Sequence, residues 1–383
     1  MSPNMPSRTM DAYERYVSAK NDEERIRYLE EYLGVIPKHK GTEKERGKLR
    51  RKLALLRESA EKRGKSGGSG RDINVKKEGA AQIVVVGFPN VGKSSLLCEI
   101  TNADSKVADY AFTTLEPIVG MMPMHNVRLQ IVDLPGLISG ASEDKGMGKR
   151  FLTVIRNSDV LMIMLDVRDR PLERLERLLR EFSMAGLRLN KEKPDVKIYK
   201  KDSGGIEILG EHLLMCDLED AVESLRDFSI LNASVRINRK MGLEDFIDAI
   251  DKSVVWKKAL VVLNKTDLWD EKETQKLANK IRRDHGFVVI PISAKQKRNI
   301  ERLKQELWNI CGLMCVYTVT SPDSDPLVIP KGSTILDAAM RIHSDFAKKL
   351  KYARVWGKSA RYGGQRVGRE HVLQDGDIIE LNA

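Results

Sequence analysis

Two glycines, a lysine and a serine between Gly87 and Ser94 have the spacing of a loop that wraps around phosphate groups. The apolar run 83–86 before the loop predicts a buried strand, and residues 95–100 after it predict a helix. In such a unit the loop turns backbone N–H groups toward phosphate oxygens, and the helix N-terminus adds partial positive charge. The sequence therefore predicts a nucleotide-binding loop. Its residues are Gly87, Phe88, Pro89, Asn90, Val91, Gly92, Lys93, Ser94 and Ser95.

Two residues of this loop, together with a D-x-x-G motif, could bind the phosphates and a metal ion. Lys93 could reach the β- and γ-phosphates, and the Ser94 hydroxyl could bind Mg²⁺. Asp133 follows the predicted strand 129–132 and could hold Mg²⁺ through water. The Gly136 backbone N–H could contact the γ-phosphate, and loss of this contact after hydrolysis would relax a switch.

An N-K-x-D motif, Asn264 to Asp267, indicates which base is bound. The Asp267 carboxylate can accept both N–H donors of guanine, whereas adenine would leave that carboxylate unpaired, which is costly. Asn264 can bond the other base edge and the loop backbone, and the Lys265 stem can cover the base. In the segment Ser293-Ala294-Lys295, the Ala294 N–H can donate to guanine O6. We therefore expect GTP and GDP as ligands, and an ATP-driven enzyme is disfavoured.

The residues available for hydrolysis are unusual. Either Thr113 or Thr114 could place a hydroxyl on Mg²⁺, and spacing alone does not choose between them. Leu137 follows the D-x-x-G motif and cannot orient water as a glutamine would, so intrinsic hydrolysis should be slow or need a group from elsewhere. Asn90 is a candidate for holding a monovalent cation. The alternative, that Asn90 only satisfies its own loop backbone, stays open.

The elements that must position these motifs alternate between strands and helices, which is typical of a mostly parallel sheet covered on both faces. Each motif stands at the carboxyl end of a predicted strand, where open α/β sheets bind ligands. The strands are predicted at residues 83–86, 129–132, 160–166, 259–263 and 288–292. A helix is predicted at 171–185. The fold class is therefore α/β, a P-loop GTPase of the Ras-like type.

The chain before the loop is predicted to be helical. One helix is expected over 8–33, and a second over 42–63, where Thr42 and Glu45 form a capping-box pattern. The second helix carries a basic face, which either is solvated and packs beside the next domain or touches RNA. The basic residues are Lys48, Arg50, Arg51, Lys52, Arg57, Lys62 and Arg63. A Gly/Ser-rich linker follows at 65–70.

Two more parts complete the predicted architecture. An inserted α/β subdomain is expected, with a hairpin strand at 204–210 and no evident chemistry. The C-terminal pattern of two strands, a helix from Thr334 to about 350 and short strands suggests a ubiquitin-like β-grasp. The predicted parts are a basic hairpin and linker (1–80), a GTPase domain (81–186 and 256–311), the insertion (187–255) and the β-grasp domain (312–383).

Composition bounds the partners and the compartment. The 383-residue chain has a net charge of +11 and a pI of about 9.3, which favours a polyanionic partner such as RNA. Its four cysteines show no zinc-site pattern and are expected to be reduced. No signal peptide or membrane span is evident, so we expect a cytoplasmic protein with no membrane partner, and no DNA is expected.

The motifs together resemble a known family. Gly-Phe-Pro-Asn-Val-Gly-Lys-Ser-Ser, Tyr-Ala-Phe-Thr-Thr-Leu, Asp-Leu-Pro-Gly-Leu-Ile and Asn-Lys-Thr-Asp are similar to Obg-related GTPases. Nearly the whole chain resembles the developmentally regulated GTP-binding (DRG) subfamily. The segment from Arg354 to Asp377 is similar to the TGS domain at that family's C-terminus.

This resemblance implies more than the residues alone do. It points to Thr114 as the Mg²⁺ ligand and to Asn90 as a residue of K⁺-stimulated hydrolysis. In this class of GTPases a hydrophobic residue such as Leu137 is usual after the D-x-x-G motif. The resemblance also implies ribosome or translation partners and a TGS domain that contacts RNA or protein. A stabilising protein partner is possible by the same resemblance. The expected function is a GTP-hydrolysing switch on ribosomes or RNA. The alternative is a GTP-dependent scaffold for a protein partner, with hydrolysis incidental.

Overall fold

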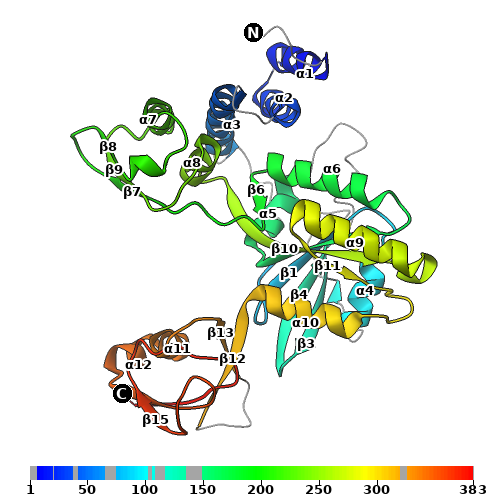
Figure 1. Cartoon of the computed structure of the whole chain (residues 1–383), viewed down its shortest axis with the longest axis vertical. Coiled ribbons are helices and arrows are strands. Elements are labelled where there is room, and N and C mark those ends of the chain that lie inside the picture. Colours follow the sequence, from blue (N-terminus) through cyan, green and yellow to red (C-terminus); the bar gives the residue numbers. More distant parts are fainter. Residues whose placement is uncertain are drawn as a thin grey trace. The chain divides into compact units, whose positions relative to one another are not determined.

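A computed structural model describes residues 7–19, 21–37, 42–64, 75–101, 106–107, 117–134, 149–319 and 326–382 (Figure 1). The chain divides into two compact units. One contains Met1–Asp72 and Glu176–Lys257, and the other contains Ile73–Leu175 and Lys258–Ala383. Within the described part of the chain, no helix is long and apolar enough to cross a membrane.

The central sheet has the order β11-β10-β5-β1-β4-β3-β2. Five strands are parallel: β1 (Gln82–Gly87), β4 (Val127–Asp133), β5 (Val160–Asp166), β10 (Val255–Asn264) and β11 (Val288–Pro291). Two antiparallel strands, β3 (Ile118–Met124) and β2 (Lys106–Val107), extend one edge. Every residue of β1 and β5 is buried, as expected for strands covered on both faces. The mostly parallel α/β sheet is confirmed, and its antiparallel edge was not predicted.

Each of these parallel strands is followed along the chain by a helix. The helices are α4 (Lys93–Ile100), α5 (Lys149–Asn157), α6 (Pro171–Met184), α9 (Glu271–His285) and α10 (Ile300–Cys311), with a short 3-10 helix η3 at Thr266–Leu268. The register sets Gly87 opposite Met164 and Asn264 opposite Asp166. The carboxyl ends of β1, β5 and β10 therefore lie next to one another.

The described residues between 7 and 64 form three helices rather than the two predicted. They are α1 (Ser7–Ser18), α2 (Asp22–Val35) and α3 (Glu43–Gly64). The single helix expected over 8–33 was wrong because Asn21 starts a new helix, with its side chain accepting from the Glu24 N–H at 2.8 Å. Thr42 donates its hydroxyl to the Pro37 carbonyl, and Glu45 accepts from the Tyr32 hydroxyl at 3.1 Å.

The inserted segment forms a three-stranded sheet with two helices. Its elements are β6 (Leu187–Leu189), β7 (Val196–Lys200), β8 (Ile206–Leu209), η2 (Glu211–Leu213), α7 (Leu218–Asp227), β9 (Ala233–Ile237) and α8 (Leu243–Ile250). The sheet order is β7-β9-β8, whereas β6 pairs with the start of β10. The prediction of a hairpin strand at 204–210 was wrong in its pairing, because β8 runs parallel to β9.

Helix α3 packs on this inserted segment through arginines. The Arg46 Nε lies 2.6 Å from Glu244, and Arg50 contacts Glu244 and Asp248 at 3.0 and 3.4 Å. Arg51 is 2% exposed and lies 3.2 Å from Asp227. These arginines serve the fold, since their charges are already paired inside the protein.

Other members of the predicted basic face have different environments. Arg57 pairs with Glu30 at 2.8 Å, whereas Lys48 and Lys52 are exposed. The side chains of Lys62 and Arg63 lie outside the described residues. These contacts do not support a continuous RNA-binding surface on the basic face of α3. They fit the other interpretation, in which the helix packs on neighbouring parts of the protein.

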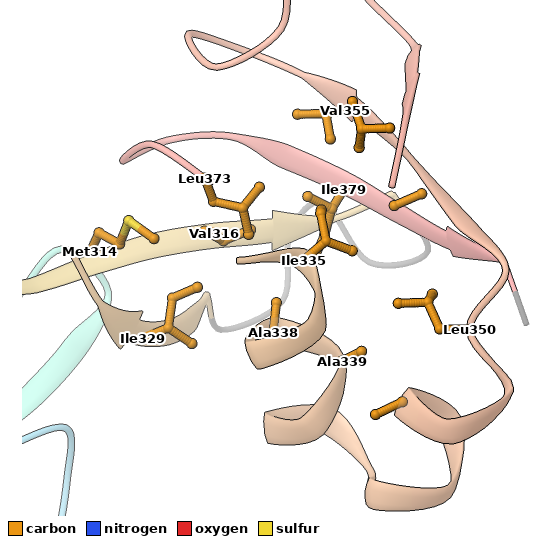
Figure 2. Packing of buried hydrophobic residues seen from close by; sticks show 13 residues of the cluster. Met314, Val316, Ile329, Ile335, Ala338, Ala339, Leu350, Val355, Leu373 and Ile379 are labelled. Atoms are coloured by element: carbon orange, nitrogen blue, oxygen red, sulfur yellow. The ribbon is translucent and has the colours of Figure 1, made fainter. Parts of the chain in front are cut away.

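The C-terminal domain is a β-grasp with the strand order β13-β12-β16-β14-β15. Its elements are β12 (Leu313–Thr318), β13 (Leu327–Pro330), α11 (Ile335–Ile342), α12 (Ser344–Lys349), β14 (Tyr352–Trp356), β15 (Gln365–Val367) and β16 (Ile378–Asn382). Figure 2 shows Ala338 of α11 turned toward the sheet that carries Val316 and Ile379, and Ala339 belongs to the same buried cluster. The single helix predicted from Thr334 to 350 was wrong, because His343 has an extended backbone that ends α11 and caps α12.

Candidate nucleotide site

The loop after β1 depends on two glycines that admit close neighbours. Gly92 has φ +98°, and a Cβ there would lie 2.5 Å from the Asn264 Nδ2. A Cβ on Gly87 would lie 2.5 Å from the Met164 backbone oxygen. Any larger residue would push the loop away from β5 and from Asn264 of the N-K-x-D motif, so both positions need glycine.

Lys93, the first residue of α4, spans the inside of this loop. Its Nζ donates to the backbone oxygens of Gly87 and Phe88, both at 3.1 Å. Burial lowers the pKa of Lys93, while the charge of Asp133 raises it. The ammonium therefore lies at the centre of the loop, and its predicted contact with the β- and γ-phosphates stays a prediction.

Ser94 and Asp133 meet at the same side of the loop. The Ser94 hydroxyl donates to the Asp133 Oδ2 at 3.0 Å, and Asp133 is buried. The other carboxylate oxygen, Oδ1, is buried without a hydrogen-bond partner. Burial raises the pKa of Asp133, against lowering by Lys93 and Ser94. A hydroxyl beside an orphaned carboxylate oxygen fits a magnesium ion, which prefers oxygen ligands.

Asn264, at the end of β10, joins the phosphate loop to the last motif. Its Nδ2 donates to the Val91 backbone oxygen at 2.8 Å, and its Oδ1 accepts from the Ala294 N–H at 3.1 Å. Asn264 is itself buried. The Ala294 N–H therefore donates to a residue of the N-K-x-D motif in this structure. Its contact with guanine O6 stays a prediction.

Lys265 makes a second link to the phosphate loop. Its Nζ lies 2.6 Å from the Asn90 backbone oxygen and 2.8 Å from the Asp166 Oδ2. Asp166 also accepts from Arg168, and these hydrogen bonds lower its pKa against the effect of burial, which is the largest single influence and raises it. Sequence reasoning missed Asp166. The signal was a carboxylate at the carboxyl end of a strand that neighbours β10.

Asp267 presents the carboxylate assigned to guanine. It lies in η3, where its Oδ1 accepts from the buried Ser293 hydroxyl at 2.5 Å. Ser293 in turn accepts from the Gln296 N–H at 3.1 Å. The Ser293 side chain thus fixes the orientation of the carboxylate, while Lys295 is exposed.

The remaining predicted site residues have diverse positions. Pro89, Asn90 and Ser95 are exposed, whereas Val91 is buried. The buried Phe88 ring is covered by the Arg174 guanidinium at 4.2 Å. Thr113, Thr114, Gly136 and Leu137 lie outside the described residues. The structure therefore brings together the phosphate loop, Asp133, Asn264 to Asp267 and Ser293-Ala294.

Comparison with known proteins agrees with this geometry. Residues 82–201 match a family model described as a 50S ribosome-binding GTPase, 203–313 match the C-terminal region of that domain, and 316–383 match the TGS domain. Developmentally-regulated GTP-binding protein 2 of Homo sapiens is 36% identical over 364 residues, which cover 94% of this chain and 98% of the relative. The chain belongs to the DRG family of GTPases.

Other members of the DRG family match over the same extent. Developmentally-regulated G-protein 3 of Arabidopsis thaliana is 34% identical over 94% of this chain and 98% of its own length. An uncharacterized GTP-binding protein of Methanocaldococcus jannaschii is 40% identical over 94% of this chain and 92% of its own length. This DRG-family GTPase therefore shares its domain set, with a TGS domain at the C-terminus, and not the GTPase domain alone.

Proposed function

We propose that this protein is a GTP-hydrolysing switch that acts on ribosomes or RNA. The observation that carries the proposal is the pair of links from the base-recognition motif to the phosphate loop. Asn264 holds the Val91 carbonyl, and Lys265 holds the Asn90 carbonyl. The motif that would read guanine thereby orients the loop that would bind the phosphates, so base selection and phosphate binding are parts of one site.

Asp267 supplies the selection for guanine in this proposal. Its Oδ1 accepts from Ser293, which leaves Oδ2 available to the donors of the base. A base without those donors would leave a carboxylate unpaired, which disfavours binding. Asn264 would bond the other base edge, and the Lys265 stem would cover the base plane.

Ser94 and Asp133 are the proposed magnesium residues, with Thr114 as a third. When bound, the ion would neutralise charge on the β- and γ-phosphates. Asp133 would supply an oxygen that has no other partner, directly or through water, and Lys93 would add positive charge from the same loop. Gly136 is proposed to sense the γ-phosphate through its backbone N–H.

Hydrolysis is proposed to be slow and stimulated by K⁺ at Asn90. The Asn90 backbone is left-handed, with φ +62°, and its side chain is exposed beside the loop. Asparagine tolerates this conformation, which is one structural reason for its presence. The exposed amide oxygen is also free to contact a cation near the phosphates, since no hydrogen bond to it is found among the described residues.

Two observations support ribosomes or RNA as the target. The model that matches residues 82–201 is described as that of a 50S ribosome-binding GTPase. The net charge of +11 favours a polyanion. A GTP-dependent scaffold for a protein partner is the alternative, and a TGS domain attached to the GTPase is compatible with either.

Co-sedimentation with salt-washed ribosomes tests the proposal. The protein is loaded with GDP, with GTP or with a non-hydrolysable GTP analogue, and the bound fraction is measured at rising KCl. We expect binding that depends on the nucleotide and falls steeply with salt, because phosphate contacts release counterions. Equal or absent binding in all nucleotide states at low salt would contradict the ribosome proposal and favour the scaffold.

A further inference from the structure

The sheet β7-β9-β8 of the inserted segment has one face in the core and one face outside. Ile198, Val235 and Ile208 lie in adjacent positions and pack toward α7 and α8. Because strand side chains alternate, the neighbouring residues point the other way. We call their surface the outer sheet face. Its residues are Lys197, Tyr199, Glu207, Leu209, Ser234 and Arg236.

Two cations face each other on this surface. Lys197 of β7 is directly opposite Arg236 of β9, and both are exposed. Like charges at opposite positions of an antiparallel pair destabilise the sheet. Neither side chain has an ion-pair partner among the described residues. Their pairing does nothing for the fold, so a ligand with negative charge would explain it.

Three acidic residues on the helices of the inserted segment pair with α3 and not with the outer sheet face. Glu244 and Asp248 on α8, and Asp227 on α7, pair with arginines of α3. On the outer sheet face, Glu207 of β8 pairs with Lys201 at 2.7 Å, and this contact lowers the pKa of Glu207. The outer sheet face therefore keeps the positive charge of Lys197 and Arg236 without an ion-pair partner among the described residues.

An aromatic ring lies beside these cations. Tyr199 is 57% exposed and follows Lys197 at the next outward position of β7, about 7 Å along the strand. Leu209, 43% exposed, is opposite Arg236 on the other side of β9. The Ser234 hydroxyl lies between Tyr199 and Glu207 in the register. An exposed tyrosine among unpaired cations matches a surface that stacks bases and holds phosphates.

We propose that the outer sheet face binds single-stranded RNA. Lys197 and Arg236 contact backbone phosphates, and a base stacks on the Tyr199 ring. An unpaired base is required because bases within a duplex do not expose a face for stacking. This inference rests on the proposed function and deepens it, because it assigns the RNA contact to the inserted segment rather than to the arginines of α3.

Binding of a labelled single-stranded oligoadenylate, measured by fluorescence anisotropy with the full-length protein, tests this surface. Tyr199→Ala should weaken binding by about tenfold or more, whereas Tyr199→Phe keeps the ring and should bind like the parent. The double variant K197A/R236A should weaken binding and lower the salt slope by roughly 1.4, from two lost phosphate contacts.

A matched control separates local contacts from net charge. The variant K272A/K280A removes two exposed lysines from α9 and should leave RNA affinity close to that of the parent. The Tyr199 variants and K272A/K280A should keep the parent thermal midpoint, since the substituted side chains are exposed, and K197A/R236A should match or exceed it, since it removes the like-charge pair. If K197A/R236A and Tyr199→Ala bind no more weakly than K272A/K280A, the assignment of this surface is overturned.

Two further measurements separate the possible failures. In the first, unlabelled polyglutamate competes with the labelled oligoadenylate. If polyglutamate displaces it as well as unlabelled RNA does, and Tyr199→Ala binds the oligoadenylate as tightly as the parent, the surface binds an acidic protein and the RNA proposal is overturned. The second is ribosome co-sedimentation. If the parent, Tyr199→Ala and K197A/R236A all bind ribosomes equally well, this surface is not the ribosome contact, but the proposed function stands. A parent protein that fails to bind ribosomes overturns the proposed function itself, whatever the oligoadenylate result.

Discussion

The ammonium group of Lys265 lies 2.6 Å from the backbone oxygen of Asn90. This contact joins the end of β10 to the phosphate loop across 175 positions of the sequence. Asp166 holds the same ammonium from the other side at 2.8 Å, and the side chain of Asp166 is 9% exposed. The lysine that would cover the guanine ring is thus held by a carboxylate that makes no predicted contact with the nucleotide.

Asp166→Asn should weaken the binding of GTP and GDP alike. The substitution removes the negative charge that positions Lys265, and we expect a loss of about tenfold in affinity, or about 1.4 kcal/mol. The turnover number at saturating GTP should change little, because Asp166 acts through Lys265. Fluorescent-nucleotide titration and steady-state kinetics measure both effects. Asp284→Asn, which changes an exposed carboxylate on α9, is the control. Unchanged nucleotide affinity in Asp166→Asn would contradict the positioning role.

Asp267→Asn should change the base that is preferred. An amide presents an N–H donor where guanine also donates, so GTP affinity should fall by about 100-fold or more. Xanthosine triphosphate, which offers a carbonyl oxygen there, should gain affinity. Competition binding with GTP, xanthosine triphosphate and ATP measures the change, with the exposed Asp284→Asn as control. If ATP competes equally with GTP in the parent protein, the assignment of Asp267 is wrong.

Asp133→Asn should stabilise the protein in EDTA while impairing its activity. Burial raises the pKa of Asp133 in the folded state, so the folded protein releases this proton at a higher pH than the unfolded chain. Stability is therefore lost as pH rises above the ordinary carboxyl range toward neutrality. Asparagine does not ionise, so the thermal midpoint of the variant should exceed that of the parent by a margin that grows as the pH rises above the ordinary carboxyl pKa of about 4 and then levels off.

The same variant should lose Mg²⁺-dependent GTP hydrolysis by more than about tenfold, since it lacks the carboxylate that fits the ion. Phosphate release is measured over a range of MgCl₂ concentrations. If the parent and the variant had equal thermal midpoints at every pH, ionisation of the buried Asp133 carboxyl would not destabilise the folded protein. Equal magnesium dependence would remove Asp133 from the metal site.

Asn90→Gly should abolish any difference between potassium and sodium. Glycine suits the positive φ of this position, so the variant removes the amide without straining the loop. The parent should hydrolyse GTP faster in KCl than in NaCl, on the order of tenfold if the cation acts as preorganised charge at the phosphates. The variant should hydrolyse at the slower rate in both salts. Equal rates of the parent in the two salts would leave Asn90 with only its backbone role.

Asp248→Ala should strongly destabilise the unit that contains α3. The Asp248 carboxylate accepts from Arg188 at 2.6 and 2.8 Å and lies 3.4 Å from Arg50. Its removal leaves buried guanidinium charge uncompensated, which costs about 3–5 kcal/mol. Asp245→Ala on the same helix is exposed and should stay within about 0.5 kcal/mol. Urea unfolding followed by circular dichroism compares the two. Equal loss in both variants would mean that the ion-pair network adds no stability.

The strands and their motifs could be predicted from the sequence because each is a local pattern. β1, β5 and β10 are short apolar runs, and residues with nucleotide chemistry follow β1 and β10 directly. The helix boundaries were harder. Asn21 and His343 each divide a segment predicted as one helix, because a side chain that caps the backbone outweighs continued helical periodicity.

By itself, the sequence determined that a phosphate loop, a D-x-x-G motif and an N-K-x-D motif follow strands of one α/β sheet. Only the tertiary structure decided that Asp166 holds Lys265 and that Arg50 and Arg51 face acids of the inserted segment. The same holds for the pairing of Lys197 with Arg236. The reason is physical. Composition and periodicity report which face of an element is apolar, whereas the partner of a charged side chain depends on strand register and helix packing between distant segments.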